Sequence, residues 1–593
     1  MRKTRRVVTN SNRMAPLKRT SVLSLSLNRR PPPVRIFDGR IHARHRSTKS
    51  ATNPTSTALP KPRLDYRALS ENAVYKSHNA FNRKAPLPVG AIQSIERLYG
   101  RHKELSHLLN GKRHAQSLLG ERIRRQRTST TASNNGGDEG EEEARRAALQ
   151  AAKQLKADIS QLEQDLAQTD DQLFALASAV PNDTHPLAPL GPSSAAVVLS
   201  THGPPNPLPH SSSPQRDHLS ISRQLGLLDL EAGATVTGSS WYYLLREAAL
   251  LEMALTNYGL SIALNHGFTP VTTPDVVRSD VARRCGFHPR DTTTTNNNKD
   301  NDNGANTPAP SQMYHLAADH YHHPDALADS TTSSHPELVL SGTAEIPLAG
   351  MFANKILALE DLPHKVVGLG RAFRVEAGAR GADTRGLYRV HQFTKLELFA
   401  VTRASQSEEV MEEMRRVQIE IFSGLGFPFR CVDNPPPRQW HIVFNFLLAV
   451  LLTEFLVRVL DMPTEELGAS AYRKYDIEAW MPGRGSWGEI SSLSNCTDYQ
   501  ARRLHIRHRP APAPSSSSPS SQTSTGLPFA HTLNGTAVAV PRLIVALLEN
   551  GARFNDSGQV VGIDLPIALK PFWPQAYSRE AVRFSGRDVV QWV

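Results

Sequence analysis

Apolar residues recur at intervals of three and four along two stretches in the first third of the chain. The seam positions are Ile95, Leu98, His102, Leu105, Leu109, Lys112, Gln116, Leu119 and Ile123 in residues 88–127, and Ala148, Ala152, Leu155, Ile159, Leu162, Leu166, Thr169, Leu173 and Leu176 in residues 141–180. This spacing places the seam on one face of a helix. The segment 128–140 between them is polar and contains glycine, as a turn does. The pattern predicts an antiparallel coiled-coil arm within residues 61–180.

From about Ser222 onward, helical and strand-like patterns alternate, which predicts a main domain over residues 222–593. Residues 365–373 have the pattern of a buried strand, residues 376–386 form a glycine-containing loop, and residues 387–401 predict a returning strand. Because side chains alternate along a strand, Phe393, Lys395 and Glu397 share one face of the returning strand.

Three segments hold too few apolar residues to build a core. Residues 181–221 begin with a run rich in Pro and Ser and predict a linker. Residues 291–312 are mostly Thr, Asn and Asp, and residues 511–526 are mostly Pro and Ser. We expect the last two to be disordered surface loops inserted in the main domain.

Positive charge is concentrated at the start of the chain. The formal net charge is +12, but residues 1–50 alone contain 14 Lys/Arg and one acid, Asp38, so the rest is nearly neutral. Net charge therefore gives no argument that the body of the protein binds nucleic acid. The leader is rich in Arg and Ser and lacks a long apolar core, which predicts a disordered mitochondrial presequence. A basic tail or a nuclear signal is the alternative.

Composition excludes several other classes of protein. The three cysteines, Cys285, Cys431 and Cys496, show no metal-ligand spacing, so neither a zinc site nor a disulfide framework is expected. The longest apolar run, Val443–Leu452, is shorter than the roughly 20 residues that span a bilayer, so we expect no membrane insertion.

The predicted hairpin carries side chains suited to binding a nucleotide and an amine. Arg374 and Glu376 follow the first strand, where a guanidinium can grip a phosphate in a fork. Phe393 on the return strand can stack on a purine, and the carboxylate of Glu397 can receive an ammonium group. Such a site would act chiefly by positioning and by stabilising charge.

Four sequence runs resemble the signatures of one family. They are Phe373-Arg-Val-Glu-Ala-Gly with Asp383-Thr-Arg-Gly-Leu and Arg389-Val-His-Gln-Phe-Thr-Lys-Leu-Glu397; Ser341-Gly-Thr-Ala-Glu345; Glu489-Ile-Ser-Ser492 with Gln500-Ala-Arg-Arg503; and Asn534-Gly-Thr-Ala-Val-Ala-Val-Pro-Arg542. Together they resemble the seryl-tRNA synthetases. The resemblance implies an α+β fold in which an antiparallel class II synthetase sheet is flanked by helices.

The resemblance also implies roles for individual residues. Arg374, Glu489 and Arg542 would be catalytic, and Glu489 with Ser492 would hold Mg²⁺, which prefers oxygen ligands. Serine would be bound by Thr343, Ala344, Glu345, Glu397 and Thr536. ATP would be bound by Arg374, Val375, Glu376, Val390, Phe393, Glu489, Ile490, Ser491, Ser492 and Arg542.

Partners follow from the same resemblance. The expected activity is a serine–tRNA ligase of the mitochondrial matrix, which activates L-serine with ATP and charges tRNA(Ser). Residues 92–127 carry nine basic and three acidic side chains, so the arm could follow an RNA backbone. A solvated helical face would explain that charge equally well, but in this family the arm contacts tRNA. The pattern of residues 241–266 predicts a long amphipathic helix. In the family this helix helps to form the dimer interface, so the resemblance implies a homodimer. Core packing would also explain the apolar positions of the helix.

Two features depart from the family. Ala382 stands where the family usually has Arg. Residues 431–458 interrupt a strand pattern, either as an insertion or as an unspliced intron, and continuous transcript reads through this segment would eliminate the intron.

Two other functions fit a related fold. One is an inactive paralogue that binds RNA or acts as a scaffold, and the other is an enzyme that loads a different amino acid. The intact set of charged residues argues against the first, and Thr343, Glu345 and Thr536 argue against the second.

Overall fold

A computed structural model describes residues 59–130, 139–202, 214–287, 313–317, 337–376, 385–426, 457–510, 526–574 and 589–593. The predicted presequence, residues 291–312, Ala382 and almost all of 431–458 and 511–526 lie outside these residues. Val457 and Arg458, which we counted with the interruption, begin a strand of the main sheet. Among the described residues, no helix is both long enough and apolar enough to cross a membrane.

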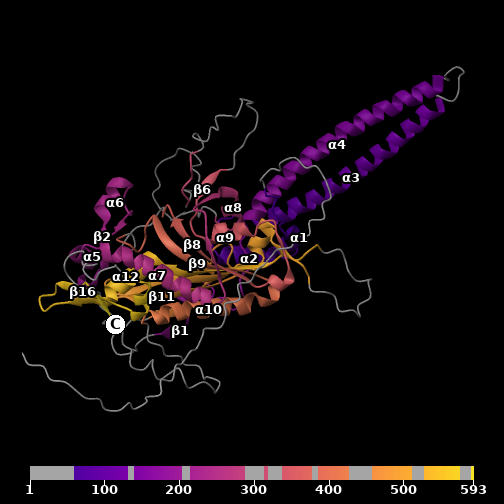
Figure 1. Cartoon of the computed structure of the whole chain (residues 1–593). Coiled ribbons are helices and arrows are strands. Elements are labelled where there is room, and N and C mark those ends of the chain that lie inside the picture. Colours follow the sequence, from indigo (N-terminus) through magenta and orange to yellow (C-terminus); the bar gives the residue numbers. More distant parts are fainter. Residues whose placement is uncertain are drawn as a thin grey trace, which may run out of the picture. The chain divides into compact units, whose positions relative to one another are not determined.

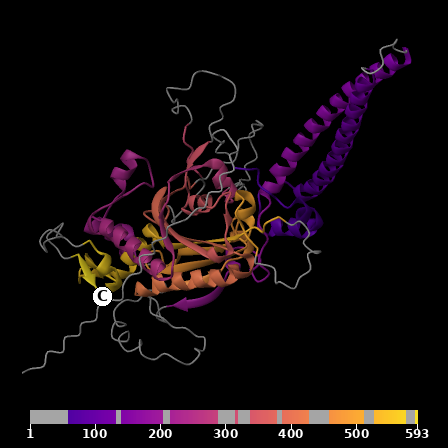
Figure 2. The same cartoon turned by 45° about the vertical axis from the view of Figure 1, so that its right-hand side comes forward.

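Both predicted long helices are present, as α3 (Ala91–Thr130) and α4 (Glu139–Ala179), after two short helices, α1 (Tyr66–Glu71) and α2 (Ala73–Asn82). They lie side by side (Figures 1 and 2). His102 Nε2 is 4.0 Å from Asp170 Oδ1 and Lys112 Nζ is 2.7 Å from Asp158 Oδ2, so positions on α4 decrease as those on α3 increase, as in an antiparallel pair. The seam buries Ile95 and Leu173 completely near the base. Farther along the seam, Leu105, Leu109 and Ile159 are buried as well.

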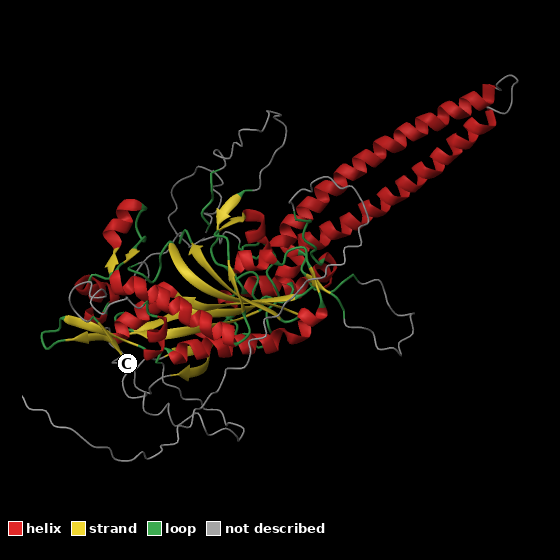
Figure 3. Cartoon of the chain, viewed as in Figure 1, coloured by secondary structure: helices red, strands yellow, loops and turns green. Residues whose placement is uncertain are grey.

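The main domain is built on an eight-stranded sheet in the order β1-β10-β11-β12-β14-β9-β8-β4. Figure 3 shows the strands in yellow and the helices beside them in red. Its strands are β1 (Val197–His202), β4 (Thr269–Thr272), β8 (His364–Phe373), β9 (Gln392–Thr402), β10 (Val457–Asp461), β11 (Arg473–Met481), β12 (Ser486–Asn495) and β14 (His531–Ala539). Neighbours pair antiparallel except β4 and β8, which are parallel. The expected α+β fold with an antiparallel sheet is confirmed.

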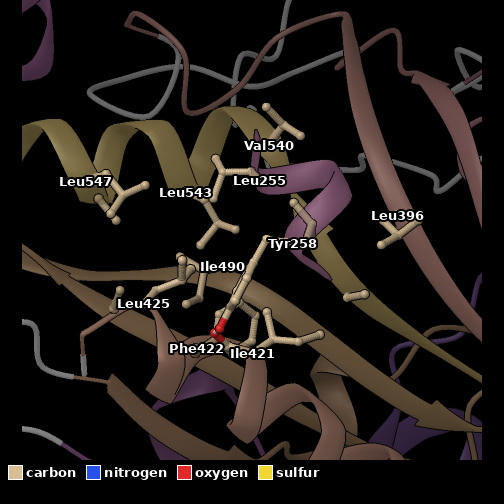
Figure 4. Packing of buried hydrophobic residues seen from close by; sticks show 14 of the residues in the cluster. Leu255, Tyr258, Leu396, Ile421, Phe422, Leu425, Ile490, Val540, Leu543 and Leu547 are labelled. Carbon is tan, nitrogen blue, oxygen red and sulfur yellow. The ribbon is translucent and has the colours of Figure 1, made fainter. Parts of the chain in front are cut away.

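The two faces of β9 have different roles. Leu396, Leu398 and Ala400 pack into the core formed with α7 (Arg246–Asn265), α10 (Ser407–Gly424) and α12 (Val540–Gly551). Figure 4 shows part of this core, where Tyr258 of α7 donates its hydroxyl to the carbonyl of Ile421 of α10, 2.9 Å away. The alternate residues, including the predicted site residues, therefore face the other side of the sheet.

That other side carries a second, smaller core. Phe399 and Val401 pack there with α8 (Ser279–Arg284), α9 (Glu345–Met351) and α11 (Tyr499–Leu504). The remaining elements are α5 (His218–Leu225), α6 (Leu230–Val236), β2 (Leu228–Asp229), β3 (Tyr243–Leu244), β5 (Val276–Arg278), β6 (Leu338–Leu340), β7 (Ile356–Leu357), β13 (Arg507–His508), β15 (Ala552–Phe554), β16 (Val560–Leu565) and β17 (Val590–Trp592).

Residues 181–221 are not a simple linker. Their described part supplies β1, the edge strand that pairs with β10, and the first turn of α5. Before β1, the Asn182 N–H donates to the carbonyl of Ala469 at 2.8 Å, and the His185 N–H donates to that of Tyr472 at 2.9 Å. A Pro- and Ser-rich composition argues against an independent core but not against an extended segment that docks through backbone hydrogen bonds.

Two predicted boundaries were also wrong. The returning strand begins at Gln392 rather than Leu387, because residues 385–391 turn along the edge of a pocket. The helix expected from Trp241 begins at Arg246, since Tyr243 and Leu244 pair with β2. Leu387 and Val390 are buried within a turn, and Trp241, Tyr242 and Leu244 are half-buried before the helix. Apolar periodicity cannot distinguish such segments from a regular strand or helix.

Candidate active site

An open pocket lies on the site face of β9, β12 and β14, and its volume of about 510 Å³ includes solvent space at its mouth. Ten predicted residues line it: Arg374, Glu376, Val390, Phe393, Glu489, Ile490, Ser491, Ser492, Thr536 and Arg542. The others, Thr343, Ala344, Glu345, Val375 and Glu397, are not in its lining. Thr343, Glu345 and Glu397 instead form a buried polar group connected to the pocket through Lys395.

A bulge in β12 brings Glu489 and Ser492 to the same side of the sheet. Glu478 of β11 pairs with Glu489 and Ile477 pairs with Ser491, so Ile490 is the extra residue. Residues three apart in a regular strand point to opposite faces, and an inserted residue reverses that relation. The half-buried positions Trp487 and Glu489 before the bulge are accordingly followed by Ser492 and Ser494 after it.

Glu489 is held ionised beside the pocket. Its Oε2 is 3.2 Å from Arg542 Nη1, and the same guanidinium nitrogen donates to its backbone carbonyl at 3.1 Å. Burial tends to raise the pKa of Glu489, but Arg542, Lys474 and Arg374 outweigh it and hold the pKa well below its usual range. Arg542 lies in the first turn of α12, directly after Pro541, which suits the start of a helix.

Arg374 is anchored at the end of β8. Its Nε–H donates to the carbonyl of Gly342 at 3.2 Å, and its guanidinium carbon lies 5.2 Å from the centre of the Phe393 ring. Its backbone N–H donates to the carbonyl of His391, so the ends of the hairpin are joined. Glu376 is paired with Arg389 at 3.2 Å on the same wall. This wall therefore presents fixed cationic and aromatic groups to the pocket.

The buried group is centred on Lys395. Its ammonium nitrogen lies 2.6 Å from Glu397 Oε2 and donates to Thr343 Oγ1 at 3.1 Å. Thr536 of β14 is the direct cross-strand partner of Glu397, so the two side chains lie on the same face. A hydroxyl, a carboxylate and an ammonium are thus gathered behind the pocket, where water has little access.

Glu345 completes this group from the first turn of α9. It is 7% exposed, and its Oε1 accepts a hydrogen bond from Gln500 Nε2 at 2.6 Å. Burial first, and the neighbouring Glu397 second, raise the pKa of Glu345, and although Lys395, Gln500 and Arg374 oppose the shift, the pKa reaches about 7. This carboxyl is therefore poised to bind a cation that lowers its pKa.

Sequence reasoning missed several residues that hold the site together. Lys395 was placed on the correct face but given no role, and Gln500 was noticed only as part of a motif. Gln418 of α10 was missed entirely; its Nε2 lies 2.9 Å from Ser491 Oγ and from the carbonyl oxygens of Ser492 and Thr536. A buried glutamine in an amphipathic helix was the available signal for Gln418, but its partners lie in distant segments.

Glu489 and Ser492 fit a hard divalent cation. A carboxylate kept ionised and a hydroxyl on the same side of the strand supply oxygen donors at an open pocket, which suits Mg²⁺. Asp217, His218 and Glu549 also lie within ligand distance of one another. There, however, the Leu387 N–H donates to His218 Nε2, so Nδ1 carries the proton and bonds Glu549. Both ring nitrogens are occupied, and this second cluster is structural.

The sheet, the bulged strand and the pocket are those of a class II aminoacyl-tRNA synthetase core. The family model described as "tRNA synthetase class II core domain (G, H, P, S and T)" matches residues 330–551. The crystal structure of seryl-tRNA synthetase from Pyrococcus horikoshii complexed with ATP is similar with a TM-score of 0.65 and 29% identity, covering 86% of this chain and 98% of that chain.

Relatives in sequence show which class II synthetase family the chain belongs to. The chain is 35% identical over 511 residues to a serine–tRNA ligase of Rubrobacter xylanophilus, covering 86% of this chain and 97% of the relative. It is 35% identical over 499 residues to the mitochondrial serine–tRNA ligase of Saccharomyces cerevisiae, covering 83% of this chain and 91% of the relative. The chain belongs to the seryl-tRNA synthetase family.

Proposed function

We propose that the protein activates L-serine with ATP to form seryl-adenylate and then transfers serine to the 3′ end of tRNA(Ser) in mitochondrial translation. The observation that carries this proposal is the pairing of an open, cation-lined pocket with a buried group of Thr343, Glu345, Glu397 and Thr536. A triphosphate fits the first part, and a small zwitterion with a hydroxyl fits the second.

In the first step, the serine carboxylate attacks the α-phosphorus of ATP and pyrophosphate leaves. Arg374 stabilises the charge that develops on the α-phosphate, and Phe393 stacks on adenine. Arg542 reaches the γ-phosphate from the start of α12. Glu489 and Ser492 would hold Mg²⁺, which would neutralise phosphate charge. Holding both substrates in line converts a bimolecular encounter into a unimolecular step.

Serine selection rests on the buried group. Glu345 and Glu397 receive the α-ammonium, assisted by Thr343, and Thr536 bonds the side-chain hydroxyl. Alanine cannot make the last bond and would leave Thr536 unpaired, so the site rejects it more strongly than threonine. In the second step, the 3′-hydroxyl of the terminal ribose of tRNA attacks the adenylate.

The direct test is serine-dependent ATP–pyrophosphate exchange by protein that lacks residues 1–50. We expect exchange with L-serine, much weaker exchange with L-alanine, and loss of exchange on chelation of divalent cations that added Mg²⁺ restores. Folded protein that supports no exchange with any amino acid would favour the inactive paralogue. Exchange with another amino acid but not with serine would contradict the specificity.

The tRNA, dimer and location proposals need separate measurements. Replacing Lys112 and Arg113 on α3 by Glu should lower tRNA(Ser) charging while leaving serine-dependent exchange unchanged, because both are remote from the pocket.

Light scattering should give the mass of a homodimer. Fusion of residues 1–50 to a fluorescent protein should deliver it to the mitochondrial matrix; delivery to the nucleus would support the alternative nuclear signal.

A further inference from the structure

The two carboxylates of the buried group are stabilised in different ways. Glu397 is 1% exposed and forms an ion pair with Lys395, so its charge is already neutralised. Glu345 instead accepts a hydrogen bond from a neutral amide, that of Gln500, at 2.6 Å. A neutral donor stabilises an ionised carboxylate without cancelling its charge. When ionised, Glu345 therefore has more of its negative charge available to a ligand than Glu397 has.

Three contacts determine the orientation of the Gln500 amide. Its nitrogen donates to Glu345 Oε1 and also, at 3.3 Å, to the backbone carbonyl of Cys285. Its oxygen accepts a hydrogen bond from Thr532 Oγ1 at 2.7 Å. A carbonyl oxygen can only accept, so a flipped amide would place two acceptors together at Cys285 and again at Glu345. The nitrogen must therefore point toward Glu345.

The supporting groups come from three separate parts of the fold. Gln500 belongs to α11 and is 0% exposed, Thr532 belongs to β14, and Cys285 directly follows α8. Thr532 is also completely buried. A fully bonded amide in such surroundings cannot rotate without breaking several hydrogen bonds that water cannot replace. Gln500 is thus preorganised before any ligand arrives.

We propose that Gln500, held by Thr532 and the Cys285 carbonyl, is the residue that orients Glu345 for the α-ammonium group of serine. It is a positioning residue, since it acts on the ligand through Glu345. The proposal rests on the proposed serine activation and adds a residue that tunes serine affinity without touching ATP.

The electrostatic surroundings predict how the effect depends on pH. Glu345 is influenced by Glu397, Lys395 and Arg374, and it lies close enough to two buried thiols to affect them. Burial raises the pKa of both thiols, so Cys285 and Cys496 stay neutral. The ionised form of Glu345 binds the ammonium, so loss of the Gln500 hydrogen bond raises the pKa further and weakens serine binding most near neutral pH.

The test compares Gln500→Leu and Thr532→Val with the unchanged protein. The Michaelis constants for serine and ATP are measured by pyrophosphate exchange between about pH 6 and pH 8.5, where Glu345 titrates. Thr402→Val is the matched control, because Thr402 is a fully buried strand threonine whose hydroxyl bonds only locally, to the Arg403 carbonyl. If Gln500→Leu does not fold, Thr532→Val carries the test, since it leaves the amide in place but removes one of the three contacts that hold it.

Gln500→Leu should raise the KM for serine at pH 7 by roughly tenfold or more, the size expected for a lost hydrogen bond to a charged group. Thr532→Val should raise it less, the rise should shrink at higher pH, and the KM for ATP should change by less than about twofold. An unchanged serine KM, or equal rises in both KM values with an unchanged pH profile, would overturn the proposal.

Binding measurements separate this proposal from the function on which it rests. Calorimetric titration of L-serine into the unchanged protein with a non-hydrolysable ATP analogue should show saturable binding, weakened in Gln500→Leu. No binding by the unchanged protein would overturn both proposals. Serine binding and exchange that survive Gln500→Leu unaltered would overturn only the role of Gln500.

Discussion

The phosphate half and the serine half of the site use charge in opposite ways. In the phosphate half, Glu489 and Arg542 line an open pocket and remain 36% and 21% exposed. In the serine half, the side chains of Lys395 and Glu397 are only 9% and 2% exposed. The first half resembles a charged surface, and the second resembles a protein core that contains ions.

The difference reflects what each half must recognise. A triphosphate is large and highly charged, and solvated guanidinium groups can hold it with little need to exclude competitors. Serine differs from alanine by one hydroxyl, and only buried groups that would be left unpaired can enforce such a distinction. Discrimination therefore requires burial, and burial raises the pKa of Glu345 to about 7.

The largest effect should come from Arg374→Ala in the phosphate half. Loss of the guanidinium removes charge stabilisation at the reacting phosphate, so exchange should fall by about 10³-fold. Steady-state exchange kinetics measure this, with a melting curve to show that the variant folds. Arg374→Lys keeps the charge but not the fork and should recover only part of the loss. A fall of less than tenfold in Arg374→Ala would remove Arg374 from its catalytic role.

Glu489→Gln should reduce exchange by about a hundredfold and raise the Mg²⁺ concentration needed for half-maximal rate. The amide keeps the shape but loses the charge that neighbouring Arg542, Lys474 and Arg374 maintain. Titration with Mg²⁺ at saturating ATP gives the measurement. An unchanged Mg²⁺ requirement would contradict the assignment of Glu489 as a ligand.

Glu345→Gln should lower kcat/KM for serine by about thirtyfold, since it removes the carboxylate that pairs with the α-ammonium group of bound serine in a buried site.

The same substitution should stabilise the ligand-free protein at pH 8. The folded-state pKa of Glu345 lies above its unfolded value, so the free energy of unfolding falls as pH rises from about 4 to about 7. Melting temperatures at pH 5 and pH 8 test this, and equal pH dependence in both proteins would contradict it.

The smallest expected effect is the pH dependence of the KM for serine in the protein without substitutions. The KM for serine should fall a few-fold as pH rises through about 7, because Glu345 becomes ionised there. The KM for ATP should show no such step from Glu489, whose pKa lies far below this range. Parallel pH profiles of the two KM values would show that the halves are not electrostatically distinct.

The spacing of apolar residues along the chain was sufficient to predict the two long helices and the two faces of one strand. The apolar repeat located α3 and α4 to within a few residues, because a helical seam is a short-range property. Period-two alternation placed Phe393, Lys395 and Glu397 on one face, and the structure puts their neighbours Leu396 and Leu398 in the opposite core. Alternation alone would put Glu489 and Ser492 on opposite faces, and the bulge at Ile490 brings them to the same side.

The sequence by itself determined the inventory of the site and the family, since motif residues and their order are readable along the chain. Only the tertiary structure decided that Glu397 is neutralised by Lys395 while Glu345 depends on Gln500, 155 residues away. It also decided that residues 197–202 complete the sheet as β1. The physical reason is that burial and hydrogen-bond partnership are properties of segments brought together in space, and these set the charge state of each carboxyl group.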